Sequence, residues 1–159
     1  MQTNQDLLTH FYTSFQKRDF QGMQACYSDD ATFSDAVFKN LDAEQVKAMW
    51  EMLVTKGKDL RIEFSGIEAD EKSGKAHWDA YYTFSATGRK VINRIDATFE
   101  FKDGKISRHI DTFDFHSWAK QAFGLMGLIF GGARFFQQKI QLKAMKNLSN
   151  FMGKNLIDR

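Results

Sequence analysis

The sequence predicts an α+β domain in which three N-terminal helices pack on the concave face of a curved antiparallel sheet, followed by a C-terminal helical extension. Three observations predict this fold. Apolar residues recur at helical spacing in residues 4–57, and from residue 60 to 115 they fall on alternate positions, as in half-buried strands. From Trp118 onward the helical spacing returns. Because a bulged sheet covered by helices on one side leaves a hollow, we expect a cone-shaped domain with a cavity.

The helices are predicted from their spacing and their caps. Residues 4–17 form an amphipathic helix, since their leucine, phenylalanine and tyrosine side chains share one face. A short second helix covers residues 20–27. A third helix begins after Asp42, which caps it while Gln45 completes a capping box, and Gly57 ends it.

The strands follow a predicted turn at residues 28–30. Inside the second strand the alternation changes phase across Ser65-Gly66, which indicates a β-bulge. Asp103-Gly104 joins the last two strands in a hairpin, because glycine reaches positive φ without steric cost. We expect strands at residues 31–35, 60–69, 76–84, 93–101 and 107–115.

The hairpin at Gly104 decides which aspartate of the last strand faces the cavity. A two-residue loop would place Asp111 opposite Asp96, whereas a type I turn with a bulge at Gly104 would place it opposite Ile95. We predict the second register, because it avoids opposing carboxylates. The inner face then carries Asn93, Ile95, Ala97, Phe99, His109, Asp111 and Phe113.

Composition indicates a soluble globular protein of ordinary domain size. The chain has 159 residues, of which 43% are hydrophobic and 26% charged. A single cysteine, Cys26, excludes an internal disulfide, and the first residues lack the pattern of a signal peptide, so we expect a cytoplasmic protein. The four histidines lack the paired spacings of a zinc site, and no phosphate-binding loop is found, so we expect neither a metal nor a cofactor.

Charge divides the chain into two parts. Between Ser117 and Arg159 seven basic residues accompany one acid, a net charge of +6, which leaves −4 for residues 1–116. We therefore expect a domain at residues 1–118 and a basic amphipathic extension at residues 119–159 packed on it. The acidic main domain argues against nucleic-acid binding. For the extension, we favour a helix that covers the domain, the cone mouth or a partner subunit over one that lies on a membrane surface.

Two strings resemble a known superfamily. Residues 27–35 read Y-S-D-D-A-T-F-S-D, which resembles the string leading into the first strand of ketosteroid isomerases. Residues 101–114 read F-K-D-G-K-I-S-R-H-I-D-T-F-D, which resembles the ending of SnoaL-like polyketide cyclases and limonene epoxide hydrolases. These families share the nuclear transport factor 2-like fold, so the resemblance implies that fold over residues 4–118.

The resemblance also implies roles for residues, position by position. Asp35 falls where the isomerases keep their proton-moving carboxylate, but Phe11 and Ala97 replace the two donors of their oxyanion hole, so steroid isomerisation is not expected. Asp111 falls where the cyclases keep an acid/base aspartate. His77-Trp78-Asp79 stands where the epoxide hydrolases keep an Arg-x-Asp that faces the last-strand aspartate, with His in place of Arg.

The candidate catalytic residues are therefore Asp111 as acid/base, His109 as its assistant, and Asp35 and Asp79 as second carboxylates. Structural alternatives stay open: Asp35 can serve only to turn the chain, and Asp79 can lie on the solvated outer face. The expected pocket lining is Phe11, Phe15, Phe33, Trp50, Asn93, Ile95, Ala97, Phe99 and Phe113.

These features favour a protein that binds a small apolar ligand or substrate. The leading hypothesis is an acid/base enzyme of isomerase, cyclase or epoxide-hydrolase type, because desolvated carboxylates make good proton carriers near neutral pH. The alternative is a non-catalytic ligand-binding or protein-interaction module of the same fold. In either case we expect a homodimer formed through the outer face of the sheet.

Overall fold

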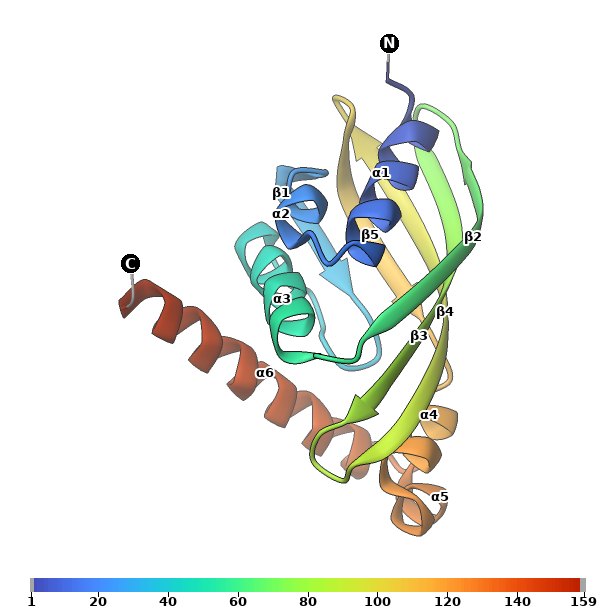
Figure 1. The fold of residues 1–159 in the computed structure, drawn as a ribbon, viewed down its shortest axis with the longest axis vertical. Helices are drawn as coiled ribbons and strands as arrows, with labels where there is room; N and C mark the ends of the chain where they lie inside the picture. The colour runs from blue at the N-terminus through green and yellow to red at the C-terminus, as the bar shows by residue number, and fades with distance from the viewer. Residues whose placement is uncertain (1, 158–159) are drawn as a thin grey trace.

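The computed structural model describes residues 2–157, with the side chains of residues 2–154, and has the predicted α+β architecture (Figure 1). Helices α1–α3 lie on one side of the sheet, and α4–α6 follow the last strand. The elements are α1 (Asn4–Gln16), α2 (Phe20–Gln24), β1 (Tyr27–Ser34), α3 (Ala43–Lys56), β2 (Arg61–Ala69), β3 (Ser73–Phe84), β4 (Arg89–Lys102), β5 (Lys105–Thr112), α4 (Phe115–Phe123), α5 (Leu125–Phe130) and α6 (Arg134–Ile157).

Within the described residues the strands form one curved, open sheet in the order β1-β5-β4-β3-β2. Strands β2 to β5 make the predicted antiparallel meander, whereas β1 joins β5 in parallel. The predicted turn at residues 28–30 is wrong, because β1 already begins at Tyr27, which pairs with Ile106. The pairing is irregular between Tyr27 and Thr32, so the polar residues between them sit in a bulged edge strand.

Local signals placed the ends of α3 correctly, whereas the second helix, predicted over residues 20–27, ends at Gln24 because Tyr27 already pairs in β1. The Asp42 carboxylate accepts the N–H of Gln45 and the Gln45 side chain accepts the N–H of Asp42, each at 2.9 Å, which is the predicted capping box of α3. Gly57 follows that helix as its C-cap. In β2 the pairing with β3 shifts between Ser65 and Glu68, which confirms the predicted bulge.

The hairpin between β4 and β5 corrects the predicted register. Asp103 and Gly104 both have positive φ, 53° and 74°, so they form a two-residue turn whose twist suits the flanking strands. The extra residue is instead Ser107, because the pairs Phe101–Ile106 and Glu100–Arg108 enclose it. Asp111 therefore pairs with Ala97 and not with Ile95. The predicted face survives, since a bulge at Ser107 restores the same phase that a bulge at Gly104 would have given.

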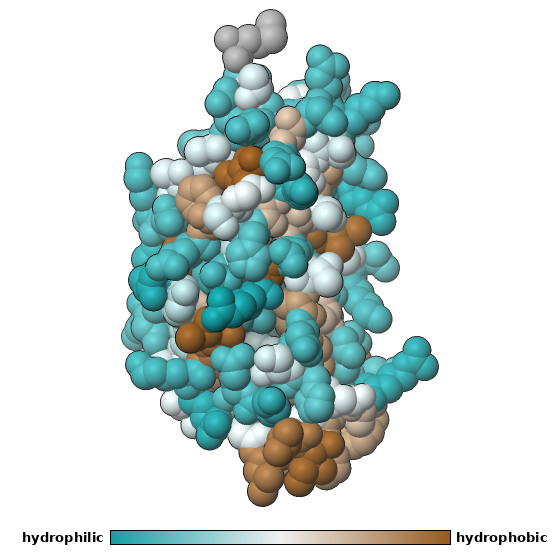
Figure 2. Space-filling view, turned by 90° about the vertical axis from the view of Figure 1, so that its right-hand side faces the viewer, coloured by the Kyte–Doolittle hydropathy of each residue, from teal (hydrophilic) through white to brown (hydrophobic). Residues whose placement is uncertain are grey.

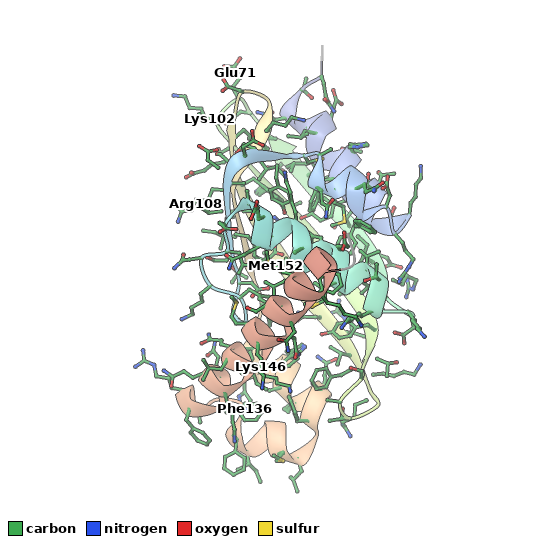
Figure 3. The ribbon with its side chains drawn as sticks, turned by 90° about the vertical axis from the view of Figure 1, so that its left-hand side faces the viewer. Glu71, Lys102, Arg108, Phe136, Lys146 and Met152 are labelled. Carbon is green, nitrogen blue, oxygen red and sulfur yellow. The ribbon has the colours of Figure 1, made fainter. Side chains whose placement is uncertain are left out.

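The core lies between the inner face of the sheet and helices α1 and α3. Helix α6 extends it, because Leu148 is buried in the same cluster and Met145, Phe151 and Met152 pack against it. In Figure 3, α6 passes in front of α3, with Met152 labelled near the crossing. A second, smaller cluster joins α4 to the start of α6 and to β4 through Trp118, Phe136 and Val91, among others. No described helix has both the length and the apolarity that a bilayer crossing requires.

Candidate functional site

A cavity of ≈ 790 Å³ opens between the inner face of the sheet, α3 and α6. Aromatic side chains dominate its walls, and two carboxylates and an amide interrupt them. Its mouth is bordered by exposed polar and charged side chains of α3 and α6. The residues discussed here are Phe15, Asp35, Trp50, Trp78, Tyr82, Asn93, Ile95, Asp111, Phe113 and Trp118 on the walls, and Lys56, Asn147, Asn150 and Lys154 at the mouth.

Asp111 is the most firmly positioned carboxylate of this cavity. It comes from the end of β5, where alternation turns every second side chain inward, and it is only 3% exposed. Its Oδ1 accepts the Nε2–H of His109 at 2.8 Å and the indole N–H of Trp78 at 3.4 Å. Among the described side chains Oδ2 has no hydrogen-bond partner, and Asp111 lines the cavity. One oxygen is thus held by the protein while the other stays free for a ligand.

A buried chain of hydrogen bonds orients His109 behind Asp111. The indole N–H of Trp50 donates to the hydroxyl of Tyr27 at 2.8 Å, and that hydroxyl lies 2.8 Å from Nδ1 of His109. Because the tyrosine oxygen accepts from Trp50, its own hydrogen is available to Nδ1, which leaves the histidine hydrogen on Nε2. This tautomer donates to Asp111, so the histidine links the tyrosine hydroxyl to the carboxylate. His109 itself is 0% exposed and does not line the cavity.

Asp35 lines the same cavity from the segment after β1. Its Oδ1 accepts the backbone N–H groups of Phe38 and Val37 at 2.7 and 2.8 Å. Burial raises the pKa of Asp35 to about 7, the two backbone donors oppose the rise, and the charge of Asp111 adds to it. Asp35 therefore turns the chain, as the structural alternative proposed, and also presents a carboxyl group that titrates near neutral pH.

Asn93 supplies the remaining polar group of the inner wall. It lies on β4, opposite Ala80 of β3, and is 8% exposed. Among the described residues its side-chain amide has no hydrogen-bond partner, and it lines the cavity. Such an amide can both donate to and accept from a ligand. Nearby, Tyr82 is fixed by the indole N–H of Trp118, which donates to its hydroxyl at 2.7 Å.

The structure separates Asp79, the third predicted carboxylate, from this cavity. Asp79 has the opposite phase to Trp78 on β3, so it lies on the outer face of the sheet. There it meets His77 at 2.8 Å, and the other ring nitrogen of His77 lies 2.9 Å from Asp96. These carboxylates raise the pKa of His77. The expected arrangement of Asp79 and Asp111 around one water is therefore corrected: the pleat puts the two aspartates on opposite faces.

The predicted pocket residues divide between cavity wall and core. Five of them line the cavity: Phe15, Trp50, Asn93, Ile95 and Phe113. The other four, Phe11, Phe33, Ala97 and Phe99, are buried in the core beneath it, where Phe11, Phe33 and Phe99 surround His109 at ring-centroid distances of 5.8, 4.9 and 4.3 Å. The prediction that these strand residues share the inner face of the sheet was correct. Alternation along a strand does not, however, tell which of them reach the cavity and which lie deeper in the core.

Sequence reasoning missed two contributors to the site. Trp78 holds Asp111, and Tyr27 sets the histidine tautomer. The phase of Trp78 on β3 was a usable signal, whereas the 82-residue separation of Tyr27 from His109 left none. Helix α6 borders the cavity mouth through Asn147 and Asn150, which is one of the positions expected for the C-terminal extension.

Comparisons with known proteins agree with this fold. A family model described as "SnoaL-like domain" matches residues 8–109. The comparison with curated proteins found no match. A solved structure described as a putative polyketide cyclase from Pseudomonas putida is similar at a TM-score of 0.65 and 19% identity, covering 77% of this chain and 99% of that one. The structure of TerC co-crystallised with polyporic acid is similar at a TM-score of 0.63 and 16% identity, and the match covers 75% of this chain and 97% of that one. The structure of an epoxide hydrolase from M. tuberculosis is similar at a TM-score of 0.59 and 19% identity, and the match covers 80% of this chain and 94% of that one.

Proposed function

We propose that this chain, which belongs to the SnoaL-like domain family of the nuclear transport factor 2-like superfamily, binds a small, largely apolar molecule and moves a proton on it. The observation that carries this proposal is a cavity with two carboxylates, Asp111 and Asp35, in different environments. Pairs of acids set apart in this way are the usual basis of acid/base chemistry at neutral pH.

Asp111 is the proton acceptor in this proposal. Its Oδ1 is held by two N–H donors, so Oδ2 is the oxygen that takes a proton from a bound molecule. The relay through His109 and Tyr27 keeps the carboxylate in place as its charge changes. His109 is therefore a positioning residue, since it touches Asp111 and not the cavity.

Asp35 is the second acid/base group. With a pKa of about 7 it exists in both forms near neutral pH, so it can return a proton to the product. Asn93 is placed to orient a polar group of the ligand, and the aromatic walls bind its apolar part. Isomerisation, cyclisation and water addition all fit this set, because each needs one proton removed and one delivered.

The proposal is tested by following proton exchange directly. The probe is 2-tetralone, a small bicyclic ketone, and its exchange of α-hydrogens for deuterium in heavy water is measured by NMR. We expect the protein to accelerate exchange above the buffer rate. Asp111→Asn should lower that acceleration by roughly 100-fold or more. Asp79→Asn, which removes a carboxylate from the outer face, should leave it unchanged.

Binding is measured separately by quenching of tryptophan fluorescence, since Trp50, Trp78 and Trp118 line the cavity. Unchanged binding with lost exchange in Asp111→Asn supports the assigned role. Equal exchange rates in wild type and Asp111→Asn would refute it. Quenching without any exchange above buffer favours the alternative, a ligand-binding module without catalysis.

A further inference from the structure

The segment after the sheet carries an exposed apolar tip. Six large apolar side chains of α5 and the start of α6 are exposed, and Leu125 and Ile129 reach 72% and 62%. Phe130 and Phe135 join the two helices, with ring centroids 6.0 Å apart. In Figure 2 a brown patch stands at the lower end of an otherwise largely hydrophilic face, where Figure 1 places α5. We call this surface the apolar tip: Leu125, Met126, Leu128, Ile129, Phe130 and Phe135.

Glycines turn the large side chains of α5 toward solvent. Gly127 of α5 and the C-cap residue Gly131 pack on α4, where a Cβ at Gly127 would lie 1.8 Å from the carbonyl oxygen of Ala119. A Cβ at Gly131 would lie 2.9 Å from the Cβ of Ala119. The small residues are thus used inside and the large apolar ones outside. This is the reverse of a helix that covers its own domain.

The tip is anchored to the rest of the molecule by hydrogen bonds. His116 Nε2 donates to the carbonyl of Leu128 at 3.0 Å, which ties α5 to α4. Arg89 Nε donates to the carbonyl of Gln121 at 2.8 Å, which ties α4 to the start of β4. The backbone that carries the apolar side chains is therefore already ordered before a partner binds. Binding then costs little further conformational entropy of the backbone.

Cations follow this tip along α6. Arg134 lies beside Phe135, and exposed Lys139, Lys143 and Lys146 follow at the spacing of the outer helical face. Leu142, 73% exposed, lies among them on that face. From Phe115 to Ile157 the sequence contains no aspartate or glutamate. The outer face of α6 thus carries exposed lysines, one exposed leucine and no acidic side chain of this helix, so an anionic surface complements its charge.

We propose that the apolar tip and the outer face of α6 dock on an anionic lipid surface. The tip enters the headgroup and acyl boundary, while Lys139, Lys143 and Lys146 meet the lipid phosphates and carboxylates. A second copy of the chain is the weaker occupant. A two-fold contact would bring the same patch against itself, so the lysines of both copies would face each other without acids to neutralise them.

The test measures how much of the full chain sediments together with lipid vesicles. One set of vesicles consists of phosphatidylcholine alone, and the other also contains about 30% phosphatidylserine. We expect binding to the anionic vesicles to be at least about 100-fold tighter than to the neutral ones, and to be lost at about 0.5 M salt. Lys139→Gln/Lys143→Gln/Lys146→Gln should weaken that binding by roughly 100-fold. Leu125→Ser/Ile129→Ser should weaken it at least about 10-fold.

The matched control is Ile92→Ser, which removes an apolar side chain of β4 that is 42% exposed and does not belong to the apolar tip. It should bind vesicles as the wild type does. Because Leu125 and Ile129 are exposed, the double variant should keep the wild-type urea midpoint, which separates lost docking from lost folding. Equal binding to neutral and anionic vesicles, or wild-type binding by the double variant, would overturn the proposal. So would a dimer in sedimentation equilibrium that the double variant alone converts to monomer.

Discussion

Asp35→Asn should make the protein more stable at alkaline pH and change little at acid pH. The pKa of Asp35 is raised from 3.8 to about 7 by burial, so the folded state binds a proton that the unfolded state has already released. Folded stability therefore falls as pH rises from about 4 to about 7, and the full cost is present above about pH 8. The shift corresponds to roughly 4 kcal/mol of lost stability for the ionised aspartate. Asparagine avoids that cost and keeps an oxygen for the N–H groups of Val37 and Phe38.

Urea unfolding of wild type and variant at about pH 5 and about pH 8 measures this effect. The pKa of Asp35 is 3.8 in the unfolded chain and about 7 in the folded one. From these two values, the free energy of unfolding of Asp35→Asn relative to wild type should increase by roughly 2–3 kcal/mol between about pH 5 and about pH 8. Asp42→Asn is the matched control, because it removes the same charge from an exposed helix cap and keeps the capping oxygen. If the difference between Asp35→Asn and wild type were the same at both pH values, the carboxyl group would not be desolvated and our assignment of its second acid/base role would fail.

Three further substitutions test the packing that holds the site. Tyr27→Phe removes the hydroxyl that pairs with Nε1 of Trp50 and Nδ1 of His109, so two buried nitrogen atoms lose their partner. The free energy of unfolding in urea should fall by roughly 3 kcal/mol, and an unchanged value would refute the relay. Leu148→Ala should lower the free energy of unfolding by about 2–5 kcal/mol, because this side chain of α6 is buried in the core. Leu142→Ala, at an exposed position of the same helix, should leave it almost unchanged, and equal effects of the two substitutions would show that α6 is not packed on the domain. Gly127→Ala should lower the melting temperature by several degrees through its clash with α4, while Gly153→Ala, with nothing within 4 Å, should raise it slightly.

The homodimer, the apolar ligand and the cytoplasmic location expected from the sequence stay predictions. The family membership and the proposed chemistry rest on different observations, since one comes from residues 8–109 as a whole and the other from the environments of Asp35 and Asp111. A failure of the exchange experiment would therefore leave the fold assignment intact. Membrane docking is independent of both, because α5 and the outer face of α6 lie outside the matched residues.

The sequence by itself determined whatever depends on near neighbours in the chain. Helical spacing, the capping box at Asp42 and the Asp-Gly turn are local, so the elements and the inward phase of Asp111 could be predicted. The resemblance of two strings added the fold, because those strings report how the elements are connected.

Only the tertiary structure decided which carboxylates share a space and what holds them. The bulge at Ser107, the position of Asp35 beside the cavity of Asp111 and the place of α6 at the cavity mouth depend on strand pairing and packing between distant segments. The tautomer of His109 is set by Tyr27, a residue brought next to it by the parallel pairing of β1 with β5. Such contacts are chosen by the free energy of the whole core, which no local window of sequence contains.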